Sequence, residues 1–418
     1  MNKITEEQKY ENAFHVDVFE KSHGCLIGAT ENNKVLTKRP NSRVKGNMMI
    51  TGQSGMGKTE SFVVPLIYQT LKDGDSLLIN DPGLYLYEQY AHIAIQAGYQ
   101  THIIGEHGNI SERANFDIIT WVGGDKYKAI EAAKCILDNS QLIPNEGYES
   151  ADKRVMLELA IAVIMFIYED EMSAKTTAQA HYFLTACDCY QAVEYIQKYD
   201  SSNEFLQKAL EELDDDKTLS HYYEALRKIL EPLCIFSAQK DIAQFEPVRM
   251  CMGKTIVFVD TEFSSNMACI LEAISYDSII YVKQKAFGML PISIHIVLDE
   301  INTCKTLSGY EKRIGYLCRI GVYTYFICAE IAQLKNAFPE EAWESVIRAC
   351  GYYLYYTSHD RETIKCFTDR HIGTITQKQL IEADMDELFV AVIKKGIYKV
   401  KKFFSNTIEL KNNDLFTK

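Results

Sequence analysis

The sequence predicts an α/β fold in which a parallel sheet is covered by helices and interrupted by an all-helical insertion. Short apolar runs bounded by turn residues alternate with stretches of helical periodicity in residues 47–125 and again in residues 246–418. Between residues 126 and 245 the strand pattern stops, and apolar residues recur at steps of three and four. The sheet is therefore expected to come from two parts of the chain, with a helical domain between them.

Length and composition fit a folded protein. The chain has 418 residues, of which 47% are hydrophobic and 24% charged, and at about 150 residues a domain this length suggests two to three domains. Such a composition excludes the collagenous and disordered classes. The net charge of −13 argues against a protein that binds nucleic acid over its whole surface, although it is compatible with a local basic channel.

Cysteines and apolar runs indicate a cytoplasmic protein. The 12 cysteines are scattered through apolar stretches, and no secretory signal precedes them, so we expect reduced thiols. Cys187 and Cys189, with His181 before them, lack a second ligand pair at a zinc-like spacing and are interpreted as structural. The longest apolar run, residues 155–168, is shorter than the about 20 residues of a membrane-spanning helix.

The chain begins with an N-terminal segment, residues 1–46, that is mixed and polar. It contains a β-like piece at residues 24–28 and a basic stretch with Lys38, Arg39, Arg43 and Lys45. Three strands are then predicted at residues 47–51, 76–81 and 101–105, each followed by a helical stretch. This alternation is typical of βαβ units.

The helical insertion is predicted to hold helices within residues 127–137, 155–168, 180–196 and 205–233. Residues 211–216, with the sequence EELDDD, carry five carboxylates in six positions. We interpret them as a solvated helix end and turn, and the alternative is a docking surface for a basic partner.

Strand patterns resume after the insertion, at residues 254–260, 293–299, 323–328 and 352–357. Two alternating runs around Gly396 predict a hairpin within residues 388–404. Five lysines alternate with apolar residues in that hairpin, namely Lys394, Lys395, Lys399, Lys401 and Lys402. We expect solvated lysines of an edge strand, and the alternative is a shared basic face.

The first motif that carries chemistry is GQSGMGKT at residues 52–59, which satisfies G-x-x-x-x-G-K-[ST]. It follows a predicted strand and precedes a helical stretch, as a phosphate-binding loop requires. Its glycines let backbone N–H groups turn toward a phosphate, Lys58 would reach the outer phosphates, and Thr59 would hold Mg²⁺. The whole loop is predicted to bind nucleotide, through Gly52, Gln53, Ser54, Gly55, Met56, Gly57, Lys58 and Thr59.

A second motif, the apolar run before Asp299 and Glu300, supplies two carboxylates at the end of a buried strand. Asp299 is predicted to bind Mg²⁺, and Glu300 to polarise the attacking water. Both motifs fall at carboxyl ends of strands, where open α/β sheets bind ligands. An arginine from a neighbouring subunit is expected to neutralise the negative charge of the transition state. Of the candidates Arg313, Arg319 and Arg348 we favour Arg319, with an exposed helix-end arginine as the alternative.

With these motifs in place, the chain resembles the coupling proteins of conjugative type IV secretion systems, the TraG/TraD-like ATPases. NMMITGQSGMGKTESFVVP at residues 47–65 is similar to the family's first motif, and SLLINDP at residues 76–82 to its second strand. Residues 291–338 are similar to its second nucleotide motif and the strand leading to a Gln-rich sensor loop.

The resemblance implies a RecA-like P-loop NTPase fold that binds ATP and Mg²⁺, with the nucleotide-binding domain in residues 47–125 and 246–418 and the all-helical domain in residues 126–245. It adds Asp81 and Gln333 to the nucleotide-binding residues. It also implies a homo-hexameric ring that hydrolyses ATP and passes single-stranded DNA with its bound relaxase to membrane-bound secretion channel proteins. Such a protein would be cytoplasmic and peripheral to the cell membrane through its partners.

Two stretches depart from the family pattern. Gly83, Leu84 and Tyr85 stand where the family has Lys-Gly-Glu, and Ala329 and Glu330 stand where it has Gln-Ser. The family's N-terminal membrane helices are not seen in this sequence either, which leads us to expect a soluble variant, a truncated one, or one that uses a membrane partner. The altered sensor loop motivates an alternative function, a nucleotide-switched adaptor that recruits substrates with little or no DNA-dependent hydrolysis. A chromosomal or phage DNA pump would use the same site.

Overall fold

The computed structural model describes residues 6–38, 44–105, 111–140, 150–170, 174–199, 203–211, 216–236, 242–262, 267–285, 288–339, 341–371 and 374–404. The predicted Arg39 and Arg43 and most of the EELDDD stretch lie outside these residues.

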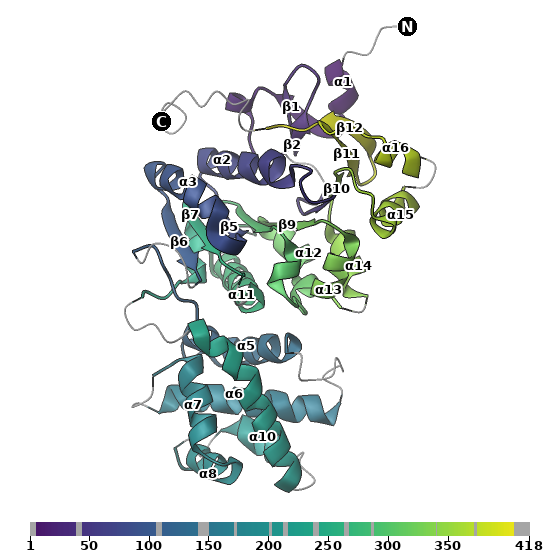
Figure 1. Ribbon diagram of the computed structural model, residues 1–418. Helices are drawn as coiled ribbons and strands as arrows, with labels where there is room; N and C mark the ends of the chain where they lie inside the picture. Colours follow the sequence, from purple (N-terminus) through teal and green to yellow (C-terminus); the bar gives the residue numbers. More distant parts are fainter. Residues whose placement is uncertain are drawn as a thin grey trace.

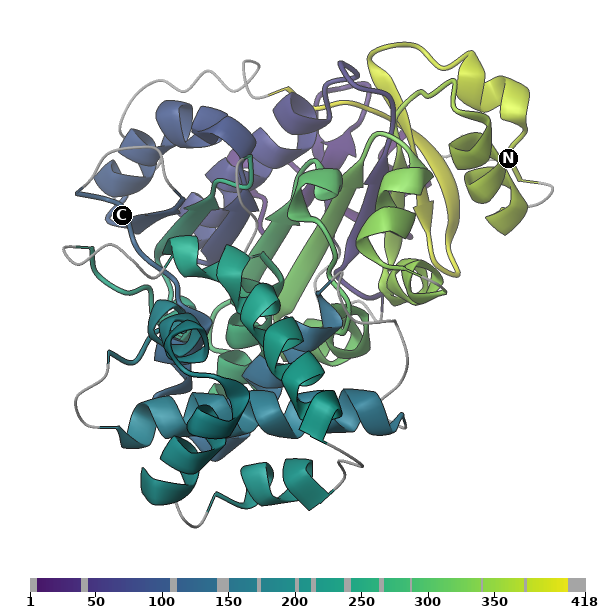
Figure 2. The same ribbon diagram turned by 60° about the horizontal axis from the view of Figure 1, so that its bottom comes forward.

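One mixed sheet forms the centre of the molecule (Figures 1 and 2), with twelve strands among the described residues in the order β1-β3-β2-β12-β11-β10-β4-β9-β8-β5-β7-β6. The strands are β1 Phe14–Asp17, β2 Leu26–Ala29, β3 Val35–Lys38, β4 Met48–Thr51, β5 Ser76–Asn80, β6 Gln100–Ile104, β7 Thr255–Val259, β8 Ile294–Leu298, β9 Val322–Cys328, β10 Tyr352–Tyr355, β11 Glu387–Val392 and β12 Gly396–Lys401. From β10 to β6 all neighbours are parallel, and from β1 to β10 all are antiparallel.

The parallel part confirms the predicted fold class. Its carboxyl ends meet at one edge of the sheet, and β9 lies between β4 and β8. The strands read as apolar runs because both faces are buried. In β4, Met48 and Ile50 pack in one core with residues of α2 and α3, whereas Met49 packs in the core on the other face.

The helices that cover the sheet are α2 Val64–Asp73, α3 Tyr85–Gln96, α11 Met267–Lys285, α12 Tyr310–Ile320, α13 Ile331–Ala337, α14 Ala342–Ala349, α15 Arg361–Arg370 and α16 Gln377–Ile381. Helix α1 spans Glu6–Tyr10. Short helical turns complete this part, namely η1 Phe19–Lys21, η2 Thr59–Val63, η3 Pro82–Leu84, η5 Pro247–Met252 and η6 Ile301–Cys304.

The all-helical insertion lies beyond one side of the sheet (Figure 1). It contains α5 Lys126–Asp138, α6 Ala151–Glu169, α7 Thr177–Ala186, α8 Cys189–Tyr199, α9 Glu204–Glu211, α10 Asp216–Leu230 and η4 Glu231–Phe236, after the short α4 Ile118–Val122. Side-chain caps begin several of these helices: Asp125 starts α5, Ser150 starts α6 and Thr176 starts α7. The chain leaves and returns through a paired neck, where Asn115 exchanges backbone hydrogen bonds with Ala243 and Phe245.

The N-terminal segment differs from the prediction, because residues 14–38 contribute three strands to the same sheet. Of these only β2 overlaps a predicted β-like piece. Strands β1, with sequence FHVD, and β3, with sequence VLTK, mix apolar and polar residues over four positions, so neither shows the apolar run of the equally short β4. Strand β2 joins them to β12, so the N-terminal and C-terminal parts of the chain extend the sheet together.

No helix in the described part of the chain is both long enough and apolar enough to cross a membrane. The 12 cysteines, all within described residues, form no disulfide. The same part of the chain holds no group of three or more His, Cys, Asp or Glu side chains that could bind a metal ion.

Candidate active site

The loop Gly52–Thr59 connects β4 to η2 and α2, at the carboxyl edge of the sheet. Gly52, Gly55 and Gly57 adopt φ angles of 157°, 80° and 75°, which side chains rarely permit. A Cβ atom at Gly52 would lie 2.3 Å from Cβ of Tyr356. The loop can therefore pass this close to the end of β10 only with a glycine at that position.

Backbone hydrogen bonds fix the beginning of the loop against two neighbouring strands. Gly52 N–H donates to the carbonyl of Cys328 at 3.3 Å, and Gln53 N–H donates to that of Thr357 at 3.2 Å. The Lys58 ammonium folds over the loop and donates to the Gly52 carbonyl at 2.5 Å and the Gln53 carbonyl at 3.2 Å. Burial lowers the Lys58 pKa, an effect that the charge of Asp299 opposes.

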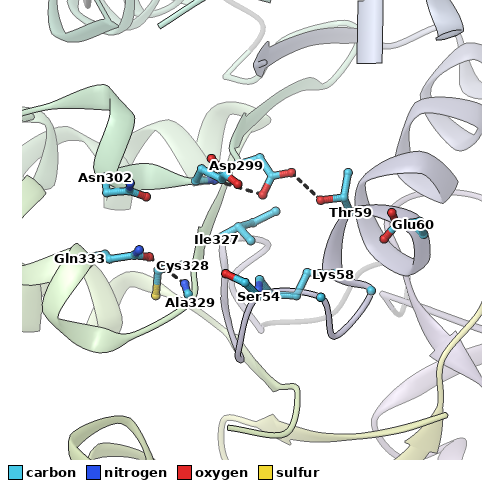
Figure 3. A pocket seen from close by; sticks show the side chains of 13 residues that line it. Ser54, Lys58, Thr59, Glu60, Asp299, Asn302, Ile327, Cys328, Ala329 and Gln333 are labelled. Atoms are coloured by element: carbon cyan, nitrogen blue, oxygen red, sulfur yellow. Dashed lines mark hydrogen bonds between the residues drawn. The ribbon is translucent and has the colours of Figure 1, made fainter. Parts of the chain in front are cut away.

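The structure brings the loop and the acidic pair together. The Thr59 hydroxyl donates to Oδ2 of Asp299 at 2.9 Å, across a sequence separation of 240 residues (Figure 3). This contact exists because β4 and β8 are separated only by β9, so the segments that follow them lie at one edge. A hydroxyl and a carboxylate at this separation are a suitable oxygen pair for Mg²⁺.

Asp299 follows β8 and is 7% exposed. Burial raises the pKa of its carboxyl to about 6, although the Thr59 hydrogen bond and the Lys58 charge act in the opposite direction. A buried carboxylate with a raised pKa is stabilised by any cation that binds beside it. The residues present therefore fit a divalent cation.

Glu300 is exposed and lies next to Asp299 with a left-handed backbone, φ 49° and ψ 59°. This conformation costs a non-glycine residue about 1 kcal/mol or more and needs support from the surrounding structure. The backbone N–H of Glu300 donates to Oδ1 of Asp299 at 3.1 Å, and its carbonyl accepts from the N–H of Thr303 at 2.9 Å and from the Thr303 hydroxyl at 3.0 Å.

A polar network under the acidic pair supplies that support, and the sequence analysis missed it. The Asn80 amide, at the end of β5, donates to the Asp299 carbonyl and to the Thr303 hydroxyl. Its oxygen accepts from the hydroxyl of Thr261, which follows β7, at 2.6 Å. Asn80 directly precedes the predicted site residue Asp81. The signal for Asn80 in the sequence was therefore a polar residue at the end of β5, the strand that pairs with β8.

A pocket of about 300 Å³ opens between the loop and the acidic pair. The predicted site residues that line it are Ser54, Gly55, Gly57, Lys58, Thr59, Asp299, Glu300 and Gln333. The other lining residues are Glu60, Asn302, Ile327, Cys328 and Ala329. Gln333 points back to the end of β9, where its side-chain oxygen accepts from the N–H of Ala329 at 2.7 Å (Figure 3). Gly52, Gln53 and Met56, the other residues of the predicted loop, are not among the lining residues.

Asp81 is placed differently from the expectation. Its carboxylate accepts from the N–H groups of Leu86 at 3.0 Å and Tyr87 at 2.8 Å, in the first turn of α3. Burial raises its pKa to about 6, and the nearby charges of Asp299 and Asp260 add to that effect. Asp81 is not among the residues that line the pocket. In this structure the carboxylate therefore accepts hydrogen bonds at the start of a helix and lies outside the pocket lining.

The three candidate arginines lie outside the pocket of their own subunit. Arg319 is exposed at the end of α12, with its guanidinium 5.4 Å from the ring centre of Tyr316. Helix α12 returns from the carboxyl end of β8 to the start of β9, so Arg319 lies at the opposite edge of the sheet from the pocket. Arg313 pairs with Glu131 and Glu272, and Arg348 pairs with Glu344.

A family description matches residues 9–384 of the chain, that of type IV secretory system conjugative DNA transfer. The chain belongs to this family. The resemblance to TraG/TraD-like coupling proteins is thereby confirmed. No curated protein matches the sequence.

Solved structures of a conjugative coupling protein share the fold. The bacterial conjugative coupling protein TrwBdeltaN70, in its unbound monoclinic form, has a TM-score of 0.66 at 10% identity, over 90% of this chain and 89% of that one. The plasmid coupling protein TrwB in complex with ADP and Mg²⁺ has a TM-score of 0.67 at 9% identity, over 88% of each chain. TrwB in complex with the ATP analogue ADPNP has a TM-score of 0.66 at 10% identity, over 88% of this chain and 87% of that one. At such identities the likeness supports the P-loop NTPase fold and no more.

Proposed function

We propose that this protein is an ATP-driven coupling protein, which hydrolyses ATP to recruit and translocate single-stranded DNA with its bound relaxase toward membrane-bound secretion channel proteins. The observation that carries the proposal is the contact between Thr59 and Asp299, which joins a phosphate-binding loop to a buried acidic strand end in one pocket. Membership of the conjugative DNA transfer family and the nucleotide complexes of TrwB support it.

In this proposal each part of the pocket has one task. The N–H groups of residues 52–59 and the Lys58 ammonium bind the phosphates of ATP. Thr59 and Asp299 would hold Mg²⁺, which would supply positive charge beside the phosphates. Glu300 orients the attacking water, and Gln333 connects the pocket to the backbone after β9.

Arg319 is proposed to act on the pocket of a neighbouring copy in a homo-hexameric ring, because it is exposed and far from its own pocket. Such an arginine stabilises charge that develops in the transition state. We further propose residues 126–245 as the all-helical domain, between the two parts of the nucleotide-binding domain in residues 47–125 and 246–418.

The test is ATP turnover with and without single-stranded DNA, comparing wild type with Lys58→Ala and Glu300→Gln. Both variants should lose about 100-fold or more of the turnover, since each removes a group acting on the transition state. Glu300→Gln should retain ATP binding, and the matched control Lys395→Ala, an exposed hairpin residue, should behave as wild type. Equal turnover in wild type and Lys58→Ala would show that the activity comes from elsewhere.

DNA stimulation separates the motor from the adaptor. Ala329 and Glu330, at the end of β9 beside the pocket, favour the adaptor as second candidate because they replace the family's Gln-Ser. A motor should show turnover stimulated by single-stranded DNA, with a stimulation that weakens steeply as salt rises. An adaptor should bind ATP, and its turnover should not respond to DNA. Its Glu300→Gln variant should capture the partner protein as well as wild type does.

A further inference from the structure

The chain returns to the phosphate-binding loop at its C-terminal end. Residues 402–404 follow β12, and the Lys402 ammonium donates to the carbonyl of Met56 at 3.0 Å, across a sequence separation of 346 residues. It also donates to the carbonyl of Met385 and lies 5.2 Å from the ring centre of Tyr356. The alternating pattern of the hairpin predicts Lys402 as a solvated lysine of an edge strand, whereas in the structure it is buried and hydrogen-bonded.

Lys402 is 7% exposed, so its charge depends on the protein for solvation. Burial lowers its pKa, and the nearby charge of Lys58 acts in the same direction, whereas Asp386 opposes both. Two ammonium groups therefore contact carbonyls of one short loop, Lys58 at Gly52 and Gln53 and Lys402 at Met56.

The planar peptide gives the Lys402 contact a direct geometric consequence. In a trans peptide the C=O and N–H groups point to opposite sides. When Lys402 holds the Met56 carbonyl, the N–H of Gly57 must therefore point away from Lys402. No cis peptide occurs among the described residues, so this constraint applies at Met56–Gly57. Gly57 lines the pocket.

We propose that Lys402 is a positioning residue of the nucleotide site, which fixes the Met56–Gly57 peptide so that the Gly57 N–H is presented to a nucleotide phosphate. This inference rests on the proposed nucleotide binding and extends it to a residue from the far end of the chain. Lys402 also makes the phosphate loop dependent on the hairpin of β11 and β12.

Residues next to Lys402 are anchored independently of it. The Phe403 ring stacks on Phe19 with 5.8 Å between ring centres and 15° between planes. The backbone N–H of Lys402 donates to the Asp386 carbonyl at 2.8 Å, and the Phe404 ring lies 3.4 Å from a Cβ atom placed on Gly57. Replacing the ammonium alone should therefore leave the path of residues 402–404 intact.

The experiment compares Lys402→Met with the matched control Lys401→Met, an adjacent lysine for which the same substitution removes the same charge. Equilibrium binding of fluorescent ADP with Mg²⁺, the melting temperature without nucleotide, and kcat and KM for ATP are measured for both. We expect Lys402→Met to weaken ADP affinity and raise KM by about 10- to 100-fold. Its kcat should stay near that of Lys401→Met, and its melting temperature should fall by only a few degrees because two carbonyls lose a donor. Lys402→Arg should recover part of the affinity.

Two results would overturn the inference: equal ADP affinity in Lys402→Met and Lys401→Met, or a fall in melting temperature large enough for unfolding to account for the loss of affinity. The second would make Lys402 a purely structural residue. Failure of the proposed function looks different, because wild type and Lys401→Met would then also fail to bind ADP.

Discussion

The two walls of the pocket are built in different ways. The phosphate-loop wall is a run of eight consecutive residues, Gly52–Thr59, whose shape follows from three glycines between a strand and a helix. The acidic wall combines residues 299–302 with residues 327–333, and its backbone is held by Asn80 and Thr261 from two further strand ends. The first wall is a local conformation, whereas the second is an assembly of distant segments.

The walls also lead to different parts of the molecule. The phosphate loop is tied by Lys402 to the hairpin of β11 and β12. The acidic wall continues through residues 305–309, where Ser308 exchanges two hydrogen bonds with the Asn139 side chain at the end of α5. It then continues into α12, where Arg313 pairs with Glu131 of α5 and Glu272 of α11. The segment that follows the acidic pair along the chain is thus in contact with the helical insertion.

The largest expected effect is that of Gly52→Ala, which would break the phosphate-loop wall. The added methyl group would lie 2.3 Å from Cβ of Tyr356 and 2.5 Å from its carbonyl oxygen. We expect the free energy of unfolding to fall by about 3 kcal/mol, together with loss of ADP binding. Denaturant unfolding and ADP titration measure both. Gly55→Ala, with no atom within 4 Å of its Cβ, should cost about 1 kcal/mol. Equal stability of the two variants would contradict the close approach.

The next effect concerns pH and the ion pair behind the acidic wall. Burial raises the pKa of Glu272 from 4.5 to about 7, with Arg313 opposing the shift. The folded state then binds more protons than the unfolded state between about pH 4.5 and 7. The contribution of this proton to the free energy of unfolding is complete below pH 4.5. It is lost as the pH rises to 7, by up to about 3 kcal/mol.

Denaturant unfolding from pH 5 to pH 8 measures this slope. Glu272→Gln should reduce it, because the amide does not titrate, while Arg313 keeps its contact with Glu131. The raised pKa values of Asp81 and Asp299 should account for part of the slope that remains. An unchanged slope in Glu272→Gln would assign the pH dependence to other groups.

Asn80→Ala should affect the acidic wall while sparing the phosphate loop. Removing the amide leaves the Asp299 carbonyl and the Thr303 hydroxyl without that donor, which costs about 1–2 kcal/mol of stability. Glu300 would then hold its left-handed backbone less well, so we expect kcat for ATP to fall about tenfold with little change in ADP affinity. Steady-state kinetics with ADP titration decide this. A loss of ADP affinity with unchanged kcat would show that the two walls are not separable in this way.

Arg319→Ala should have the smallest effect on the isolated chain. The side chain is exposed, and its one aromatic contact is with Tyr316 on the same helix, so the free energy of unfolding should change by less than about 0.5 kcal/mol. Turnover should fall only under conditions in which copies assemble, which a titration of protein concentration would reveal. A defect in turnover that is independent of concentration would argue against action on a neighbouring copy.

The comparison of the two walls also explains which predictions were within reach of the sequence. The apolar runs of the parallel strands gave their positions, since strands buried on both faces are recognisable one at a time. Strands β1 and β3 were not predicted because FHVD and VLTK mix apolar and polar residues, unlike the equally short apolar runs of β4 and β10. The family resemblance predicts Asp81 as a nucleotide-binding residue, and only the structure shows that its oxygens accept from the first turn of α3. The position of Asp81 after its strand is the same whether its carboxylate binds a nucleotide or the first turn of α3.

By itself the sequence determined the fold class and the phosphate-loop motif, because strand burial, helix periodicity and glycine freedom are properties of neighbouring residues. The tertiary structure decided which distant side chains meet. Thr59 contacts Asp299, Asn80 supports the backbone beside Glu300, and Lys402 reaches Met56. Such contacts depend on the strand order of the sheet, which places segments hundreds of residues apart at one edge.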